Sequence, residues 1–196
     1  MTDLVLATRN RHKGEELAAL LGDLPIRIRT LADFPHAPEV VEDGTTCEAN
    51  AIKKATEIAR ATGLPAVADD TGLEVDALDG RPGVYAARYA GEQATYADNC
   101  RKLLQELSGV PRKQRTARFL TVAALAGPDG TVRVTQGALD GVITEQPRGG
   151  EGFGYDPVFF VPALGRTLAE LSPAEKNAIS HRAAAFRKMK EILRGL

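Results

Sequence analysis

The stretch AVADDTG, residues 66–72, organises the rest of the chain. Three small apolar residues predict the end of a short buried strand, and the carboxylates of Asp69 and Asp70 follow at once. Two adjacent carboxylates at a strand end are costly to desolvate without a partner. We therefore expect these carboxylates either to bind a cation or to take part in a proton transfer. The alternative is a solvated turn in which an aspartate caps the next element.

Length and composition narrow the class of protein. The 196 residues suffice for one substantial domain or for two small lobes that share a sheet. Lys and Arg number 25 and Asp and Glu 26, and this balance argues against a nucleic-acid-binding surface. Cys47 and Cys100 lack metal-ligand spacing and are typical of reduced thiols. Without a signal peptide or long apolar span, we expect a soluble cytoplasmic protein with no membrane partner.

A polar, basic loop follows the first predicted strand, residues 4–7, and precedes a helix. Backbone amides and the helix dipole at such a position favour an anion, so we expect a phosphate site. The loop lacks the glycine-rich run and the ending of a Walker motif. A solvated basic turn is the alternative. The loop residues are Thr8, Arg9, Asn10, Arg11, His12 and Lys13.

A second helix is predicted from the capping-box spacing of Thr45 and Glu48 to about residue 62. Asn50 and Lys54 lie four residues apart in it and are therefore neighbours on its surface. Taken alone, Lys53 and Lys54 are typical of a solvated helix face.

Most of the remaining pattern predicts strands and then helices. The expected elements are a partly buried segment at 73–78, a helix at 95–107, strands at 115–126, 131–135, 138–144 and 158–161, and a helical C-terminal part that begins after Ser172. Helical crossovers between the early strands and a late hairpin predict an α/β protein with a mixed sheet.

Two later segments carry further candidate ligand groups. The glycine-rich loop 149–157 lets a backbone approach a ligand closely, and Phe153 within it offers a stacking face. A flexible turn is the alternative. Lys176, His181 and Arg182 follow the cap at Ser172, although a lone histidine is more often structural.

Loops at the carboxyl edge of an α/β sheet converge on one crevice, which would gather the polar segments. Carboxylates without a Cys or His cluster suit Mg²⁺ or Mn²⁺, and cations opposite them suit a polyphosphate. A metal held by carboxylates, together with cations that meet the phosphates, is typical of phosphoryl or nucleotidyl transfer. We expect water to be the nucleophile, because no serine or cysteine lies in a nucleophile motif.

Four motifs together resemble the Ham1/RdgB-type non-canonical purine nucleoside triphosphate pyrophosphatases, also called inosine triphosphatases. They are Thr8-x-Asn10-x-x-Lys13, Ala68-Asp69-Asp70-Thr71-Gly72, Phe153-Gly154-Tyr155-Asp156-Pro157 and Ser180-His181-Arg182. The motifs occur in the family's order and cover nearly the whole chain. The resemblance implies hydrolysis of ITP, dITP and XTP to the monophosphate and pyrophosphate with Mg²⁺.

The resemblance also implies a fold and an assembly. We expect a single domain over residues 1–196, in which an elongated mixed β-sheet flanked by helices forms two lobes with a central substrate cleft. Family members are typically homodimers.

Residue roles carry over from the matching motifs. Asp70 would accept a proton and bind metal with Glu42, while Lys13 and Lys54 would meet the phosphates. Adjacent strand residues point to opposite faces, so Asp69 cannot share the task of Asp70; we expect Asp69 to support the site or to contact the metal through water, and Asn50 to support the site as well. The remaining substrate-binding residues would be Thr8, Arg9, Asn10, Arg11, His12, Thr71, Phe153, Gly154, Tyr155, Asp156, Lys176, His181 and Arg182. His12 stands where a small residue is common in the family, and its bulk could narrow the phosphate loop.

Two other functions stay open. One is a metal-dependent nucleotide pyrophosphatase of broader specificity. The other is a nucleotide-binding module without catalysis, against which the acid cluster argues, since binding alone needs no such cluster.

Overall fold

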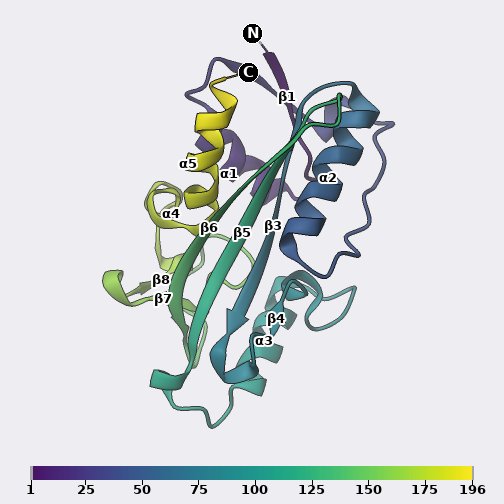
Figure 1. Ribbon diagram of the computed structural model, residues 1–196. Helices are drawn as coiled ribbons and strands as arrows, with labels where there is room; N and C mark the ends of the chain where they lie inside the picture. The colour runs from purple at the N-terminus through teal and green to yellow at the C-terminus, as the bar shows by residue number, and fades with distance from the viewer. Residues whose placement is uncertain (1, 196) are drawn as a thin grey trace. The chain divides into compact units, whose positions relative to one another are not determined.

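The fold is a mixed α/β architecture, as the sequence predicts (Figure 1). The computed structural model describes residues 2–195, so the two end residues of the expected domain lie outside the described part. The strands are β1 (Thr2–Leu6), β2 (Ile26–Thr30), β3 (Ala66–Val75), β4 (Pro82–Gly83), β5 (Thr116–Ala126), β6 (Val132–Ile143), β7 (Phe159–Val161) and β8 (Arg166–Thr167). The helices are α1 (Arg11–Leu21), α2 (Cys47–Thr62), α3 (Tyr96–Glu106), α4 (Pro173–Ile179) and α5 (His181–Leu193).

The strands hydrogen-bond in the order β2-β1-β3-β5-β6-β7-β8, and β4 pairs with β3. Around β1 the sheet is parallel, with Leu4 opposite Ile28 and Leu6 opposite Val67. Parallel pairing requires crossovers, which α1 and α2 provide. Since β1 ends at Leu6, the loop that follows it begins beside the acidic part of β3.

The acidic pair lies inside a strand, which corrects the predicted strand end at residue 68. β3 continues through Asp69 and Asp70 to Val75 and takes in the first half of the segment that the sequence predicts separately at 73–78, while Asp76–Leu78 form a short 3-10 helix. Both carboxylates are buried. A strand tolerates buried charges only where neighbouring elements supply partners, and a pattern along one strand does not show those partners.

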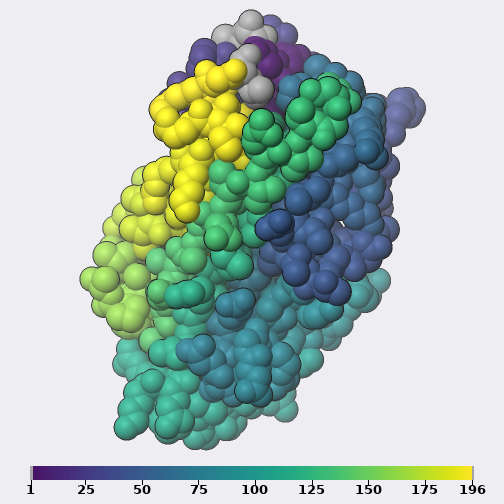
Figure 2. Space-filling view, viewed as in Figure 1, coloured from purple at the N-terminus to yellow at the C-terminus, as the bar shows by residue number. Residues whose placement is uncertain are grey.

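The separate strands predicted at 131–135 and 138–144 are one strand, β6. Gly137 lies within it and leaves room for α5, because a Cβ there would approach the Ala185 nitrogen and the His181 carbonyl oxygen to 2.3 Å. Thr135 Oγ1 also donates to the Ala185 carbonyl at 2.9 Å. Figure 2 accordingly shows the yellow α5 segment beside the green β6 segment.

Helix ends follow local side-chain chemistry. Thr46, one residue after the predicted cap, caps α2, and its Oγ1 accepts from the Ala49 nitrogen at 3.1 Å. Gly63, with φ of 68°, ends this helix. The capping box of Ser172 and Glu175 at the start of α4 is confirmed. The C-terminal helical part is interrupted at Ser180, so that α5 starts at His181.

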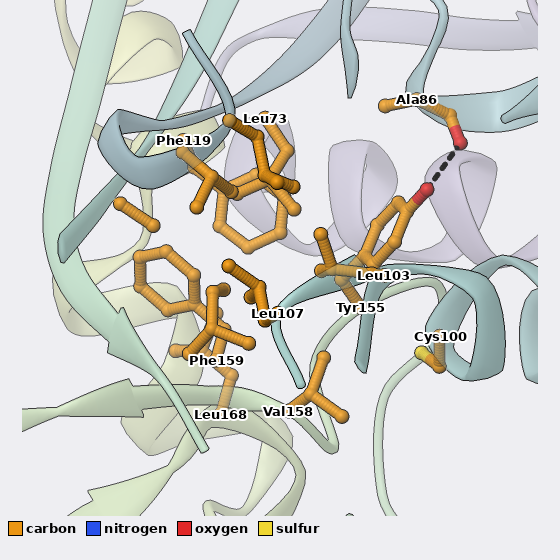
Figure 3. Packing of buried hydrophobic residues seen from close by; sticks show 14 of the residues in the cluster. Leu73, Ala86, Cys100, Leu103, Leu107, Phe119, Tyr155, Val158, Phe159 and Leu168 are labelled. Atoms are coloured by element: carbon orange, nitrogen blue, oxygen red, sulfur yellow. Dashed lines mark hydrogen bonds between the residues drawn. The ribbon is translucent and has the colours of Figure 1, made fainter. Parts of the chain in front are cut away.

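The chain forms two compact units, each with its own hydrophobic core. Unit 1 comprises Met1–Asp70, Thr121–Gly137 and His181–Leu196, and unit 2 comprises Thr71–Leu120 and Ala138–Ser180. In unit 1, residues of β1, α1 and α5 such as Leu4, Leu17 and Phe186 pack together. In unit 2, the rings of Phe119 and Phe159 lie 4.5 Å apart at their centroids (Figure 3).

Candidate active site

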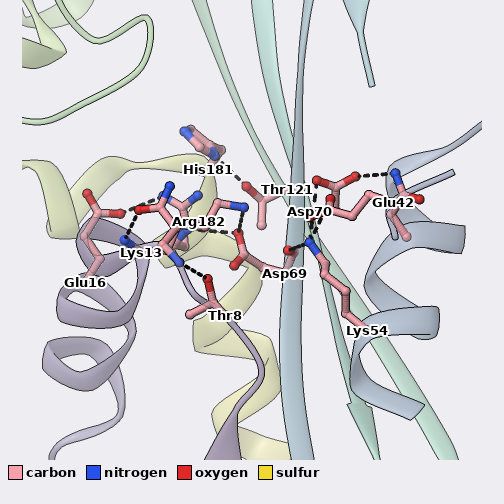
Figure 4. Close-up of polar contacts among 12 residues, drawn as sticks. Thr8, Lys13, Glu16, Glu42, Lys54, Asp69, Asp70, Thr121, His181 and Arg182 are labelled. Carbon is pink, nitrogen blue, oxygen red and sulfur yellow. Dashed lines mark hydrogen bonds and ion pairs between the residues drawn. The ribbon is translucent and has the colours of Figure 1, made fainter. Parts of the chain in front are cut away.

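The carboxylates of Asp69 and Asp70 lie on opposite sides of β3 (Figure 4). Successive side chains of a strand alternate between the two faces of a sheet, so the two neighbours meet different partners. Asp69 contacts Lys13 from α1 and Arg182 from α5. Asp70 faces α2, which carries Lys54. All of these residues belong to unit 1.

The Asp69 side is a buried ion cluster. Its Oδ2 lies 3.3 Å from Lys13 Nζ and accepts from Arg182 Nε at 3.1 Å, while Arg182 Nη1 donates to Glu16 Oε2 at 2.6 Å. Burial alone would raise the pKa of Asp69, but Lys13 and Arg182 outweigh it and hold that pKa well below its usual range. Two cations therefore balance two carboxylates, and Asp69 stays ionised.

The Asp70 side gathers two carboxylates around one ammonium. Lys54 Nζ lies 3.0 Å from Glu42 Oε2 and 3.9 Å from Asp70 Oδ1, and it donates to the Asp69 carbonyl at 2.8 Å. Asn50 Nδ2 donates to Asp70 Oδ2 at 3.0 Å. Lys54 is only 8% exposed, so it does not belong to the solvated face that its sequence context suggests.

Burial raises the pKa of Asp70, and the nearby Glu42 carboxylate adds to that increase, while Lys54 and Lys13 oppose it. A buried carboxyl with a raised pKa beside cations is suited to accept a proton. Glu42, Asp70 and Lys54 together carry two negative charges and one positive charge. Among residues 2–195 no group of three or more His, Cys, Asp or Glu side chains is arranged to hold a metal ion.

The predicted phosphate loop lies at the start of α1. Asn10 caps the helix by accepting from the Lys13 nitrogen at 3.2 Å, and Thr8 Oγ1 accepts from the Asn10 nitrogen at 3.1 Å. Arg9 donates to the Ala37 carbonyl at 3.0 Å. These bonds shape the loop and place Lys13 beside Asp69. The two remaining loop residues, Arg11 and His12, are exposed, and Arg11 pairs with Glu15.

The glycine-rich loop forms a second cluster, which lies in unit 2. Lys176 Nζ pairs with Asp156 Oδ2 at 2.5 Å and lies 4.6 Å from the centroid of the Phe153 ring. The Phe153 nitrogen donates to the same Asp156 oxygen at 2.8 Å. The ring centroids of Tyr96 and Phe153 lie 5.9 Å apart. An aromatic face beside a cation suits a purine base.

Three other predicted residues are placed differently. Tyr155 is buried in the core of unit 2, where its hydroxyl donates to the Ala86 carbonyl at 2.8 Å (Figure 3). Gly154 has φ of 64°, and its carbonyl accepts from Cys100 Sγ at 3.3 Å. Thr71 is half-buried directly after Asp70 in β3.

His181 is buried, and its Nδ1 lies 2.6 Å from Thr121 Oγ1 of β5. Thr121 and Glu16 are not among the predicted site residues. Glu16 follows Lys13 by three residues on α1, so helical spacing could have indicated it. No sequence pattern indicates Thr121, because it meets His181 only through the arrangement of β5 in the sheet beside the start of α5.

No helix in residues 2–195 combines the length and the apolar character that crossing a bilayer requires.

Comparison with known proteins agrees with the four sequence motifs. The model of the Ham1 family matches residues 4–192. The dITP/XTP pyrophosphatase of Geobacter sulfurreducens is 55% identical, with 98% of this chain and 97% of the relative covered, and that of Geobacillus kaustophilus is 52% identical, with 97% and 94% covered. A HAM1 protein structure from Coxiella burnetii superimposes with a TM-score of 0.90 at 43% identity, covering 100% of both chains. The chain therefore belongs to the Ham1 family.

Proposed function

We propose that the protein hydrolyses non-canonical purine nucleoside triphosphates, namely dITP, XTP and ITP, to the monophosphate and pyrophosphate, and so removes them from the nucleotide pool. The observation that carries this proposal is the division of charge across β3. A balanced cluster holds Lys13 on one side, and the carboxylates of Glu42 and Asp70 converge on Lys54 on the other. The names of the relatives, dITP/XTP pyrophosphatases, supply the substrate class.

Mg²⁺, with Mn²⁺ as a substitute, fits the Asp70 side. The donor set consists of hard carboxylate oxygens, which these ions prefer. The Lys54 ammonium contacts both carboxylates, which shows that this site attracts a cation. Two ionised carboxylates and one ammonium leave a net charge of minus one, so a metal cation would still be attracted. Glu42 and Asp70 would hold the ion. When bound, it would lower the pKa of water and offset charge on the phosphate oxygens.

The chain's own residues would then act on the phosphates. Asp70 takes the proton of the water that attacks the α-phosphorus, and pyrophosphate leaves. Lys13 and Lys54 offset the negative charge that develops on the phosphate oxygens. Asp69 keeps Lys13 in position and holds Lys54 through its carbonyl.

The unit 2 cluster would receive the base. Phe153 offers a stacking face, and Lys176 offers a donor to the 6-keto oxygen of hypoxanthine or xanthine. The amino group of adenine would leave such donors unpaired, which costs about 1–3 kcal/mol each.

The test is a panel of pyrophosphate-release assays with purified protein and Mg²⁺. We expect dITP, XTP and ITP to be cleaved much faster than ATP, GTP and the pyrimidine triphosphates. Equal rates on all purine triphosphates would contradict the proposed preference for non-canonical purines. Comparable rates on pyrimidine triphosphates would favour the pyrophosphatase of broader specificity. Binding of dITP without turnover in the presence of Mg²⁺ would favour a binding module.

We also propose that the protein works as a homodimer in the cytoplasm, as the family resemblance implies. Light scattering coupled to gel filtration measures the mass of the particle, and a monomer at assay concentration would contradict the dimer. Cell fractionation tests the location.

A further inference from the structure

One asparagine joins the two segments that carry the candidate metal ligands. Asn50 is 1% exposed near the start of α2. Its Oδ1 accepts from the Gly44 nitrogen at 2.8 Å, and its Nδ2 donates to Asp70 Oδ2 at 3.0 Å. Gly44 lies in the turn before α2, two residues after Glu42. A single amide therefore spans from the Glu42 turn to Asp70.

The two bonds fix which way the amide faces. A backbone N–H can only donate, so the atom that faces Gly44 must be Oδ1, and Nδ2 must then face Asp70. That bond engages one oxygen of the Asp70 carboxylate and leaves the other, Oδ1, toward Lys54. The rotation of the carboxylate is thereby tied to the position of the turn.

Gly44 must be a glycine for this contact to form. A Cβ at residue 44 would lie 2.6 Å from Asn50 Oδ1 and 3.0 Å from Ala49 Cβ. Gly44 is not among the residues with positive φ, so the requirement is one of space and not of backbone conformation. Any side chain at this position would displace the Asn50 amide.

We propose that Asn50 is a positioning residue that couples the Glu42 turn to the Asp70 carboxylate, so that both candidate metal ligands are held in one arrangement before metal binds. This inference rests on the proposed function, because it assigns Asn50 a task at that same site. Groups that orient metal ligands in this way typically contribute about 10- to 100-fold to metal affinity or activity.

The experiment measures binding of Mn²⁺ to the full-length protein without nucleotide, by electron paramagnetic resonance or calorimetry. Asn50→Ala removes both bonds and should weaken Mn²⁺ binding about 10- to 100-fold. Gly44→Ala removes no polar side chain, yet it should weaken binding in the same way because its methyl group displaces the amide. With dITP and Mg²⁺, both variants should lower kcat more than they raise KM.

The double variant separates coupling from general damage. Once residue 50 is alanine, the amide oxygen 2.6 Å from a methyl group at residue 44 is gone, and only the 3.0 Å approach to the exposed Ala49 Cβ remains. Adding Gly44→Ala to Asn50→Ala should therefore have a much smaller effect than Gly44→Ala has alone, and the two substitutions should be strongly non-additive. Thr45→Ala, an exposed change in the same turn, should leave Mn²⁺ binding unchanged.

Asn99 on α3 provides a matched control. It is also 1% exposed, and its amide accepts from the Ala90 nitrogen at 2.8 Å and donates to the Ala87 carbonyl at 3.0 Å. Asn99→Ala likewise removes one accepted and one donated bond at a buried helix position, and neither bond involves Glu42, Asp70 or Lys54. It should lower the unfolding temperature comparably to Asn50→Ala and leave Mn²⁺ affinity unchanged.

The proposal is overturned if Asn50→Ala binds Mn²⁺ like the wild type, if Asn50→Ala and Asn99→Ala lose Mn²⁺ affinity equally, or if the two single effects add. Hydrolysis of dITP by the wild-type protein, assayed in parallel, tests the proposed function separately. If Asn50→Ala does not fold, Gly44→Ala alone decides, because wild-type Mn²⁺ affinity in that variant contradicts the coupling.

Discussion

Asp69 and Asp70 are consecutive residues of one strand, yet their carboxylates meet different cations: Oδ2 of Asp69 lies 3.3 Å from Lys13 Nζ, and Oδ1 of Asp70 lies 3.9 Å from Lys54 Nζ. The two carboxyls also have pKa values displaced in opposite directions, downward for Asp69 and upward for Asp70. One acid is therefore an ionised anchor, and the other is suited to exchange a proton. Substitutions of the two should have different consequences.

Asp70→Asn should reduce pyrophosphate release from dITP by about 10²- to 10⁴-fold, the usual contribution of a general acid or base. The fold should persist, because burial disfavours the ionised Asp70 carboxyl. A folded-state pKa above the unfolded value means that the native state binds the proton more tightly, so wild-type stability falls as pH rises through that window. Without metal at neutral pH, the variant should therefore be at least as stable as the wild type. Retained turnover would remove Asp70 from the mechanism.

Asp69→Asn should instead destabilise the protein, by about 3–5 kcal/mol, because Lys13 and Arg182 lose their buried counter-charge. The folded-state pKa of Asp69 is depressed, so its contribution is fully present above the unfolded value of about 3.9 and is lost as pH falls toward the folded value. Urea unfolding should show a constant difference from the wild type between about pH 5 and 8 that shrinks below about pH 4. A difference that grows on acidification would contradict this account.

Lys54→Met should separate metal binding from turnover. Without the ammonium, Glu42 and Asp70 face each other with two uncompensated negative charges, so Mn²⁺ should bind more tightly. Pyrophosphate release should nevertheless fall, by about 10²-fold, because a cation that meets the phosphates is lost. Lys53→Met is the matched control, since Lys53 pairs with the exposed Asp43 at the surface. Weaker Mn²⁺ binding in Lys54→Met would show that the ammonium does not compete with the metal.

Phe153→Ala should raise KM for dITP with a smaller effect on kcat. Stacking of a base on an aromatic ring is worth about 1–3 kcal/mol, which corresponds to a change in KM of about 5- to 150-fold. Phe160→Ala is the control, because this half-buried ring packs under Arg112 and Arg148 and lies outside the glycine-rich loop. Initial rates over a range of dITP concentrations measure both parameters. Equal KM increases in the two variants would indicate a general loss of packing.

Much of the fold could be predicted from local patterns. The order of strands and helices follows from hydrophobic periodicity, and Gly63 and Ser172 mark helix ends because the chemistry of a cap is local. The four motifs together also indicate the family. Each motif is a short stretch of consecutive or nearly consecutive residues, so it can be recognised without knowledge of the tertiary structure. The shape and the cleft that the resemblance implies stay predictions.

The sequence by itself determined the mixed α/β class, the family and the types of residue that the site contains. Only the tertiary structure decided that β3 continues through the acidic pair, that Lys54 is buried, and that Asn50 connects Gly44 to Asp70. The physical reason is that a charge in a strand interior is stable only when distant segments neutralise it. Lys13 and Arg182, 169 residues apart in the chain, meet at one oxygen of Asp69, and no pattern along the sequence records that meeting.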